Sequence, residues 1–136
     1  TSLYDNLYLR PYKEVKFQGY IENNLMITEN GFAYVKINND IIKEYSVDAA
    51  TPGNLINNLN FIEEIYAWAF FTEDIKNNTI RGSIRSRGPI INDVAFKYNG
   101  GGHMYASGVR FNSLDECDSL IEDLDKRCKE YKENVE

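Results

Sequence analysis

The residues best suited to chemistry gather in one run near the C-terminus, Gly100-Gly101-Gly102-His103-Met104-Tyr105-Ala106-Ser107-Gly108. Glycine loses more backbone entropy on ordering than any other residue, so three in succession suit a backbone that must approach something closely. Successive peptide N–H groups without side chains form a concavity suited to an anion. His103, the only histidine of the chain, and Ser107 add donors at its rim. We therefore expect Gly100, Gly101, Gly102, His103 and Ser107 to bind a phosphate or another compact anion, with empty space above Gly101.

A second group of polar residues precedes this run in the segment Ser83-Ile84-Arg85-Ser86-Arg87. If the segment is a strand, Arg81, Ser83, Arg85 and Arg87 share one face, because side chains alternate between the faces of a sheet. A guanidinium group matches two phosphate oxygens at once, which an ammonium group does not. We expect Arg85 and Arg87 to hold substrate phosphates, and a merely solvated strand face is the alternative.

The charge of the chain is distributed unevenly. The 136 residues carry a formal net charge of −6, yet residues 81–110 contain five Lys and Arg against one Asp. The sequence pI of about 4.9 argues against a broad basic surface for long duplexes. A phosphate-bearing nucleotide, or the end of a short single-stranded nucleic acid, needs only this local positive charge.

Each of these residues also has a structural interpretation. The glycine run could be a plain loop that joins a helix to a strand. The His103 side chain could hydrogen-bond only to the backbone of its own loop, and Ser107 could serve only the turn before Gly108. Because the glycine run and His103 occur together with the basic strand, we favour the interpretation as an anion site.

The two motifs together carry a resemblance to a known family. S-I-R-S-R followed by G-G-G-H-x-x-A-S-G resembles the DHHA1 domain of the DHH phosphoesterases, and most closely the branch of bifunctional oligoribonucleases and pAp phosphatases. The resemblance implies the C-terminal substrate-binding half of a cytoplasmic hydrolase that cleaves phosphoester bonds in short oligonucleotides, cyclic dinucleotides or pAp. The chain begins with Thr1 rather than methionine, so we expect residues 1–136 to be a single DHHA1-like domain, a C-terminal fragment of a larger protein.

Catalysis by this chain alone is not expected. Metal-assisted phosphoester hydrolysis needs carboxylates and histidines clustered around the ions, and this chain has one histidine and no Asp-His-His triplet. The resemblance places a divalent metal, manganese or similar, in an N-terminal DHH domain that is absent here and that would be the partner of this domain. We therefore assign neither a catalytic nor a metal-binding residue to this chain. The alternative is a stand-alone nucleotide- or RNA-binding module without a catalytic partner.

Composition limits the setting in which the domain works. No apolar run approaches the roughly 18 residues that would span a membrane, so we expect no membrane contact, and the resemblance implies a cytoplasmic protein. Cys117 and Cys128 are too far apart on one helix for a disulfide and are expected to be buried, reduced thiols. The nucleotide that is cut, the direction of cleavage and the oligomeric state, a homodimer included, stay open.

The pattern of apolar residues predicts an α/β (α+β) fold with a mixed sheet of about five strands flanked by helices. Residues 65–72 form an apolar run typical of a strand buried on both faces, and Asn30-Gly31 between two apolar runs is typical of a hairpin. Further strands are expected at residues 79–87 and 105–111. A first helical region is expected over most of residues 3–23, with Pro11 at the first turn of its second segment. Further helices are expected to begin after Asn39 or Asp40 as cap, after a turn at Thr51-Pro52-Gly53, and after Asn92 as cap. The last helix is expected to begin at the Ser113–Glu116 capping box.

Overall fold

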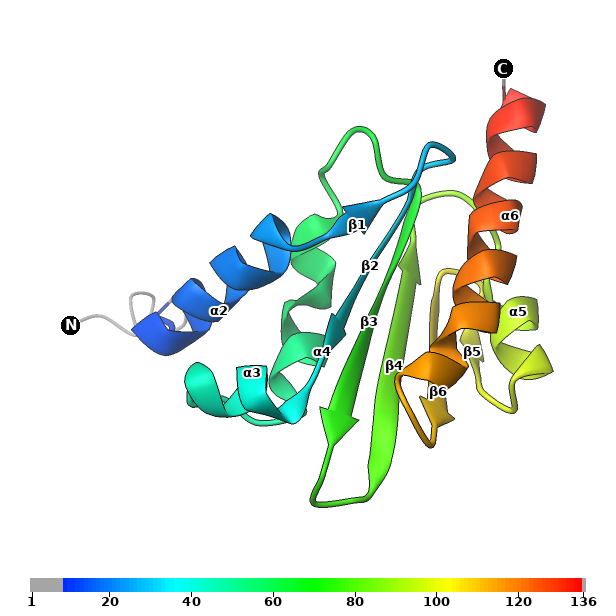
Figure 1. Ribbon diagram of the computed structural model, residues 1–136. Helices are drawn as coiled ribbons and strands as arrows, with labels where there is room; N and C mark the ends of the chain where they lie inside the picture. Colours follow the sequence, from blue (N-terminus) through cyan, green and yellow to red (C-terminus); the bar gives the residue numbers. More distant parts are fainter. Residues whose placement is uncertain (1–8, 136) are drawn as a thin grey trace.

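The fold is built on one open, mixed sheet (Figure 1). The computed structural model describes residues 9–135. The strands lie in the order β1-β2-β3-β4-β6-β5. β2 and β3 run parallel, and the other neighbouring pairs are antiparallel. The strands are β1 (Met26–Ile27), β2 (Phe32–Ile37), β3 (Ala67–Asp74), β4 (Thr79–Ser86), β5 (Gly101–His103) and β6 (Ala106–Phe111).

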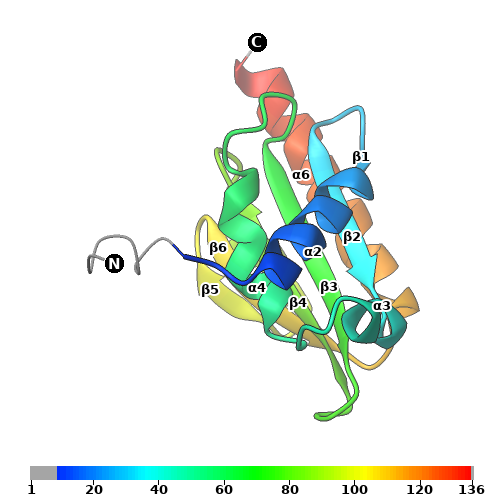
Figure 2. The same ribbon diagram turned by 90° about the vertical axis from the view of Figure 1, so that its left-hand side faces the viewer.

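Helices cover both faces of this sheet (Figures 1 and 2). The first face carries α2 (Tyr12–Asn23), α3 (Asn39–Glu44), α4 (Thr51–Leu55) and the 3₁₀ helix η1 (Ile56–Leu59). The second face carries α5 (Asn92–Lys97), the 3₁₀ helix η2 (Asp115–Cys117) and α6 (Asp118–Val135).

The central strand β3 belongs to both cores. Trp68 and Phe70 pack in the core beneath the first group of helices, whereas Phe71 packs in the core beneath α5 and α6. The indole N–H of Trp68 donates to the carbonyl oxygen of Ile56 at 2.7 Å, so its polar atom is satisfied inside the core. The prediction of a strand buried on both faces is therefore confirmed, with its start two residues later than expected.

The expected hairpin and the first helix are also present. Gly31 has φ +86° in the turn between β1 and β2, a conformation that only glycine adopts without strain. Pro11 directly precedes α2, where its missing N–H costs no hydrogen bond. Part of the predicted N-terminal helix, residues 3–8, lies outside the described residues.

Four details differ from the sequence predictions. The sheet has six strands because residues 101–103 pair with β6 as an additional edge strand. Asn38, rather than Asn39 or Asp40, caps α3 by accepting from the N–H of Ile41 at 3.0 Å. Thr51-Pro52-Gly53 begins α4 instead of forming a separate turn. Asn92 is the first residue of α5, not its cap, since the cap position is Ile91.

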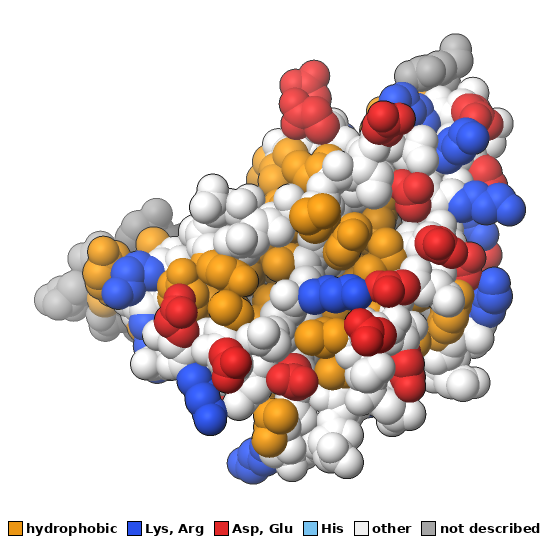
Figure 3. Space-filling model, viewed as in Figure 1, with side chains coloured by type: hydrophobic (Ala, Val, Ile, Leu, Met, Phe, Trp, Pro, Cys, Tyr) orange, Lys and Arg blue, Asp and Glu red, His pale blue; other side chains and the backbone are white. Residues whose placement is uncertain are grey.

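The C-terminal helix keeps its predicted apolar stripe but begins differently: Leu114, not Ser113, is at the cap position of the 3₁₀ helix η2, and α6 starts at Asp118. The Ser113 hydroxyl accepts from the N–H of Glu116 at 3.4 Å, and the Glu116 carboxylate accepts from the N–H of Asn112 at 2.9 Å, so the capping exchange reaches one residue further back. Acidic and basic side chains mix along the outer face of α6 (Figure 3). The predicted apolar stripe is buried at Cys117, Leu120, Ile121, Leu124 and Cys128 and partly buried at Leu114 and Tyr131.

Both cysteines are buried and unpaired, as expected. Within residues 9–135, no helix is both long enough and apolar enough to cross a membrane.

Candidate functional site

The candidate site lies on one face of the sheet, where β4, β6 and β5 run side by side. Residues alternate along β4 as predicted: Ile80 and Ile84 are buried in the core under α5 and α6, and Arg81 and Arg85 face the opposite way, partly exposed. Arg87 lies beyond the end of the strand at Ser86. The predicted basic face therefore exists, but Arg87 is not part of it.

Strand pairing arranges the site residues in three rows, because directly opposed residues of an antiparallel pair share a face. Each row crosses two or three strands, and successive rows are two residues apart along β4. The rows are Arg85–Ala106–His103, Ser83–Gly108–Gly101 and Arg81–Arg110. The sheet thus brings Arg85 and His103 to one end of a common face and sets two further arginines at the other end.

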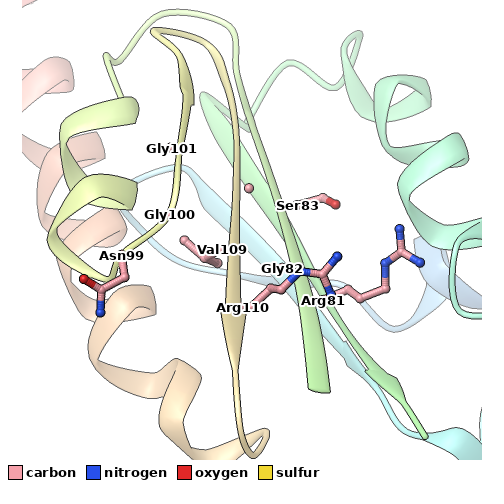
Figure 4. A pocket seen from close by; sticks show the side chains of 9 residues that line it. Arg81, Gly82, Ser83, Asn99, Gly100, Gly101, Val109 and Arg110 are labelled. Carbon is pink, nitrogen blue, oxygen red and sulfur yellow. The ribbon is translucent and has the colours of Figure 1, made fainter. Parts of the chain in front are cut away.

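An open groove of about 530 Å³ occupies the middle and far end of this face. Arg81, Ser83 and Arg110 extend to the same side of the sheet, away from α5 and α6 (Figure 4). The groove is lined by Arg81, Gly82, Ser83, Asn99, Gly100, Gly101, Gly108, Val109 and Arg110.

Gly108 leaves the floor of the groove bare. Among residues 9–135, a Cβ atom added there would have only the carbonyl oxygen of Gly82 nearby, at 3.5 Å, which is an ordinary contact. Gly108 lies at the centre of the middle row, so its missing side chain opens the face to a ligand.

The glycine run itself is explained in large part by packing. Asn99, which follows the C-cap residue of α5, has φ +65°, and the N–H of Gly100 donates to the carbonyl oxygen of Ala95 at 2.9 Å. A side chain at Gly100 would overlap the carbonyl of Gly108. Gly102 has φ +143° and lies so close to β6 that an added Cβ would be 2.5 Å from the Ala106 carbonyl oxygen.

Gly101 is in a different situation from the expected one. The space above it is not empty, since an added Cβ would lie 3.0 Å from the ring of Phe96 on α5. Gly101 begins the edge strand β5, and an edge strand leaves alternate N–H groups without a partner strand. Any amide offered to an anion therefore lies along that outer edge, and the Gly100 amide already has a partner.

His103 and Ser107 are joined at the hairpin between β5 and β6. The Ser107 hydroxyl donates to the carbonyl oxygen of His103 at 2.9 Å, and Ser107 is only 4% exposed. The His103 side chain is exposed in the same row as Arg85. The serine braces the loop, whereas the histidine faces solvent beside the groove.

Arg87 is engaged with the loop before β3. Its guanidinium group donates to the carbonyl oxygens of Ile62, Glu63 and Ile65, with distances of 2.6–3.2 Å. It also lies 5.7 Å from the ring centroid of Tyr66. These contacts engage Nε and Nη2 of Arg87, two of the three guanidinium nitrogens with which it was expected to hold a phosphate.

Arg85 is placed quite differently. It is partly buried, and its one protein hydrogen bond within the described residues runs to the carbonyl oxygen of Ile84 at 2.8 Å. No carboxylate of the described chain forms an ion pair with it. Burial lowers the pKa of Arg85 because desolvation disfavours its charged form. An anion at this end of the face would stabilise the charged form and offset that penalty.

Sequence reasoning did not select Arg81 or Arg110 as binding residues, although both lie in the basic segment. Strand alternation offered the signal, since Arg110 follows Gly108 by two residues on the predicted strand 105–111. What the sequence did not show is the register between β4 and β6, which sets Arg81 directly opposite Arg110.

Metal ligands are not gathered in this part of the chain. Among residues 9–135, no three His, Cys, Asp or Glu side chains are arranged so that they could hold a metal ion.

The fold, the basic face and the two motifs define a domain of the DHHA1 family, and the chain belongs to that family: the DHHA1 domain model matches residues 29–130. The match includes both motifs and confirms the resemblance.

Among curated proteins, the chain is 40% identical over 131 residues to the bifunctional oligoribonuclease and PAP phosphatase NrnA of Bacillus subtilis. It is 33% identical over 114 residues to a probable NrnA of Streptococcus mutans. These alignments cover 96% and 84% of this chain, but the chain spans only 41% and 36% of those relatives' length.

Solved structures share the fold at low sequence identity. An exopolyphosphatase-related protein from Bacteroides fragilis superposes with a TM-score of 0.79 at 23% identity, over 97% of this chain and 39% of that one. The pGpG-specific phosphodiesterase PggH from Vibrio superposes with a TM-score of 0.60 at 13% identity, over 88% of this chain and 40% of that one.

Proposed function

We propose that this domain binds the phosphate-bearing substrate of a metal-dependent DHH phosphoesterase, which acts in the cytoplasm on short oligonucleotides or pAp. The relatives named as oligoribonucleases and PAP phosphatases support this substrate class. The divalent metal, manganese or similar, and the residues that hold it belong to the preceding DHH domain. This domain faces the metal across a cleft and presents the substrate to it.

The observation that carries the proposal is that Arg85 is partly buried and has no carboxylate partner among the described residues. A guanidinium group that is partly withdrawn from water without a carboxylate partner is unfavourable, and the pKa of Arg85 is lowered by that burial. Its neighbours in the row are the small Ala106 and the exposed His103. A phosphate group bound between Arg85 and His103 would receive a two-donor fork from one side and an imidazole N–H from the other.

The two residues have separable roles in this proposal. Arg85 holds the phosphate in the ground state as well as in the transition state, because its charge is permanent. His103 acts on charge that develops during cleavage, so its effect belongs mainly to the transition state. Gly101 and Gly102 bring the backbone of the edge strand close to the same anion, and Ser107 fixes the loop.

The direct test joins this domain to its DHH partner and compares the pair with the domain alone. With manganese, the two-domain protein should hydrolyse pAp and short oligoribonucleotides, and the 136-residue chain should not. Metal-dependent turnover by the rigorously purified chain would contradict the division of labour. A gene that lacks a DHH domain upstream would favour the stand-alone binding module instead.

Variants of His103 test whether this side chain acts in catalysis or only in the structure of its loop. In the two-domain protein, His103→Ala should lower kcat on the order of a hundredfold with a smaller change in KM. His103→Asn or His103→Gln, each of which keeps a donor, should recover part of the loss. The thermal unfolding curve of each variant serves as the control for folding. A fully active His103→Ala protein would reduce the histidine to a structural element of its loop.

A further inference from the structure

The far end of the groove holds a second concentration of positive charge. Arg81 on β4 and Arg110 on β6 are direct register partners, and Figure 4 shows both side chains extending to the same side. Like charges directly opposite each other on a sheet destabilise it. The arrangement therefore costs stability in the absence of a ligand.

Only one carboxylate lies close to this pair among the described residues. Asp74 Oδ2 is 3.8 Å from Nη1 of Arg81, at the outer limit of an ion pair. The same carboxylate accepts from the side-chain amide of Asn77 at 2.8 Å and from its backbone N–H at 3.3 Å. The pKa of Asp74 is lowered first by these bonds from Asn77 and then by Arg81 and Arg110. The Asp74 carboxylate, which already accepts hydrogen bonds from Asn77 in its own turn, is thus the one nearby negative charge for two guanidinium groups among the described residues.

The surroundings of the pair suit a ligand. Between the pair and the opposite end of the face lie Ser83, with a hydroxyl group, and Gly108, without a side chain. Asn99 adds an amide to the lining of the same groove. An anion at the pair would meet two guanidinium groups on a surface that no side chain at Gly108 blocks.

The distance between the two ends sets the length of the ligand. Arg81 and Arg85 are four residues apart on β4 and extend from the same face, so their Cα atoms are separated by roughly 13 Å at about 3.3 Å per residue. That separation exceeds the distance between the 3′ and 5′ phosphates of one nucleotide. A ligand that reaches both ends must therefore carry phosphates on more than one linked nucleotide.

We propose that Arg81 and Arg110 form a second phosphate subsite, which binds a distal phosphate of a single-stranded oligonucleotide whose first phosphate lies at Arg85. This inference rests on the proposed function, because it takes the Arg85 end as the primary phosphate position. It implies that affinity depends on ligand length, because mononucleotides bind at one end of the groove and oligonucleotides bind at both.

The test is the dependence of affinity on ligand length. The 136-residue chain is titrated with 5′-phosphorylated oligoadenylates of one to four nucleotides, at two or more salt concentrations. Affinity should rise between one and three nucleotides. Arg81→Gln and Arg110→Gln should weaken the trinucleotide about ten- to hundredfold and the mononucleotide much less. The slope of log affinity against log salt for the trinucleotide should become less negative by about 0.7 for each phosphate that no longer pairs with an arginine.

Two comparisons make the outcome decisive. Lys129→Gln, which removes an exposed charge on α6, is the matched control and should change neither affinity. Equal affinity of the wild-type chain for one and three nucleotides, or a length dependence that survives in both arginine variants, would overturn the second subsite. Loss of the mononucleotide to the same degree would place these arginines at the primary position and also overturn it. Arg85→Gln tests the proposed function separately, since it should weaken ligands of every length.

Discussion

The Ser107 hydroxyl donates a hydrogen bond to the backbone carbonyl oxygen of His103 across the hairpin between β5 and β6, at 2.9 Å. The bond ties the buried Ser107 of β6 to the loop that carries the exposed imidazole. The motif therefore contains Ser107, which positions the loop, and His103, which faces solvent beside the groove. The two can be separated by mutation because they act through different atoms.

Ser107→Ala should destabilise the domain by about 0.5–1.5 kcal/mol, the net value of a typical hydrogen bond. The His103 loop would lose its brace, so nucleotide binding should weaken as well, and less than it does for Arg85→Ala. Urea unfolding and a binding titration measure the two effects. Ser119→Ala on the exposed side of α6 is the control. Unchanged stability in Ser107→Ala would show that the bond does not contribute.

The two arginines of the S-I-R-S-R motif should behave as opposites. Arg85 has one backbone partner and no carboxylate partner among the described residues, so Arg85→Ala should weaken phosphate binding about ten- to hundredfold and leave the melting temperature nearly unchanged. Arg87→Ala should lower stability by about 1.5–3 kcal/mol at most, since three carbonyl oxygens lose their donor.

Lysine replacements separate charge from geometry in this pair. Arg85→Lys should recover part of the binding, because it keeps the charge and loses the fork. Arg87→Lys should recover only part of the stability: an ammonium group can replace Nη2, which alone contacts the carbonyl oxygens of Ile62, Glu63 and Ile65, but the bond from Nε to Ile65 is lost. If Arg87→Ala instead abolished binding in a fully stable domain, Arg87 would be a ligand contact and its loop contacts secondary.

Much of the fold could be predicted from the sequence because its signals are local. The apolar run before Thr72 and the stripe on α6 each determine an element by periodicity alone. The site was predicted only in outline. The charge of residues 81–110 and the glycine run indicated where an anion binds, yet the register of β4 against β6 decides which arginines meet. The position of Arg87 could not be predicted, because its partners lie more than 20 residues away in the chain.

The thiols of Cys117 and Cys128 should be unreactive in the folded domain. Burial raises the pKa of each to about 12, and the thiolate is the reactive form. At pH 8 both groups stay protonated, and labelling by a thiol reagent should be slow until the chain unfolds. The unfolded chain in concentrated urea, with ordinary thiol pKa values, gives the rate for comparison. Rapid labelling of the folded chain would mean that α6 opens readily.

Gly101 and Gly108 provide a matched pair, since they are register partners on β5 and β6 with different surroundings. A side chain at Gly108 points into the groove and meets only the Gly82 carbonyl at 3.5 Å. Gly108→Val should therefore weaken nucleotide binding strongly and leave the fold intact, because a β-branched residue suits a strand. A side chain at Gly101 meets the Phe96 ring, so Gly101→Val should displace that ring.

The two substitutions should affect different properties: Gly108→Val should lower nucleotide affinity, and Gly101→Val should lower stability. Gly108→Val should reduce affinity at least tenfold, a cost of about 1.4 kcal/mol or more, with unchanged or slightly higher stability. Gly101→Val should lower stability by about 1–3 kcal/mol, the usual cost of overpacking. Gly101→Val combined with Phe96→Ala should recover much of that stability, since the ring is what the new side chain strikes. Binding titrations and urea unfolding of the four proteins measure both properties. Full affinity in Gly108→Val would show that no ligand occupies the floor of the groove.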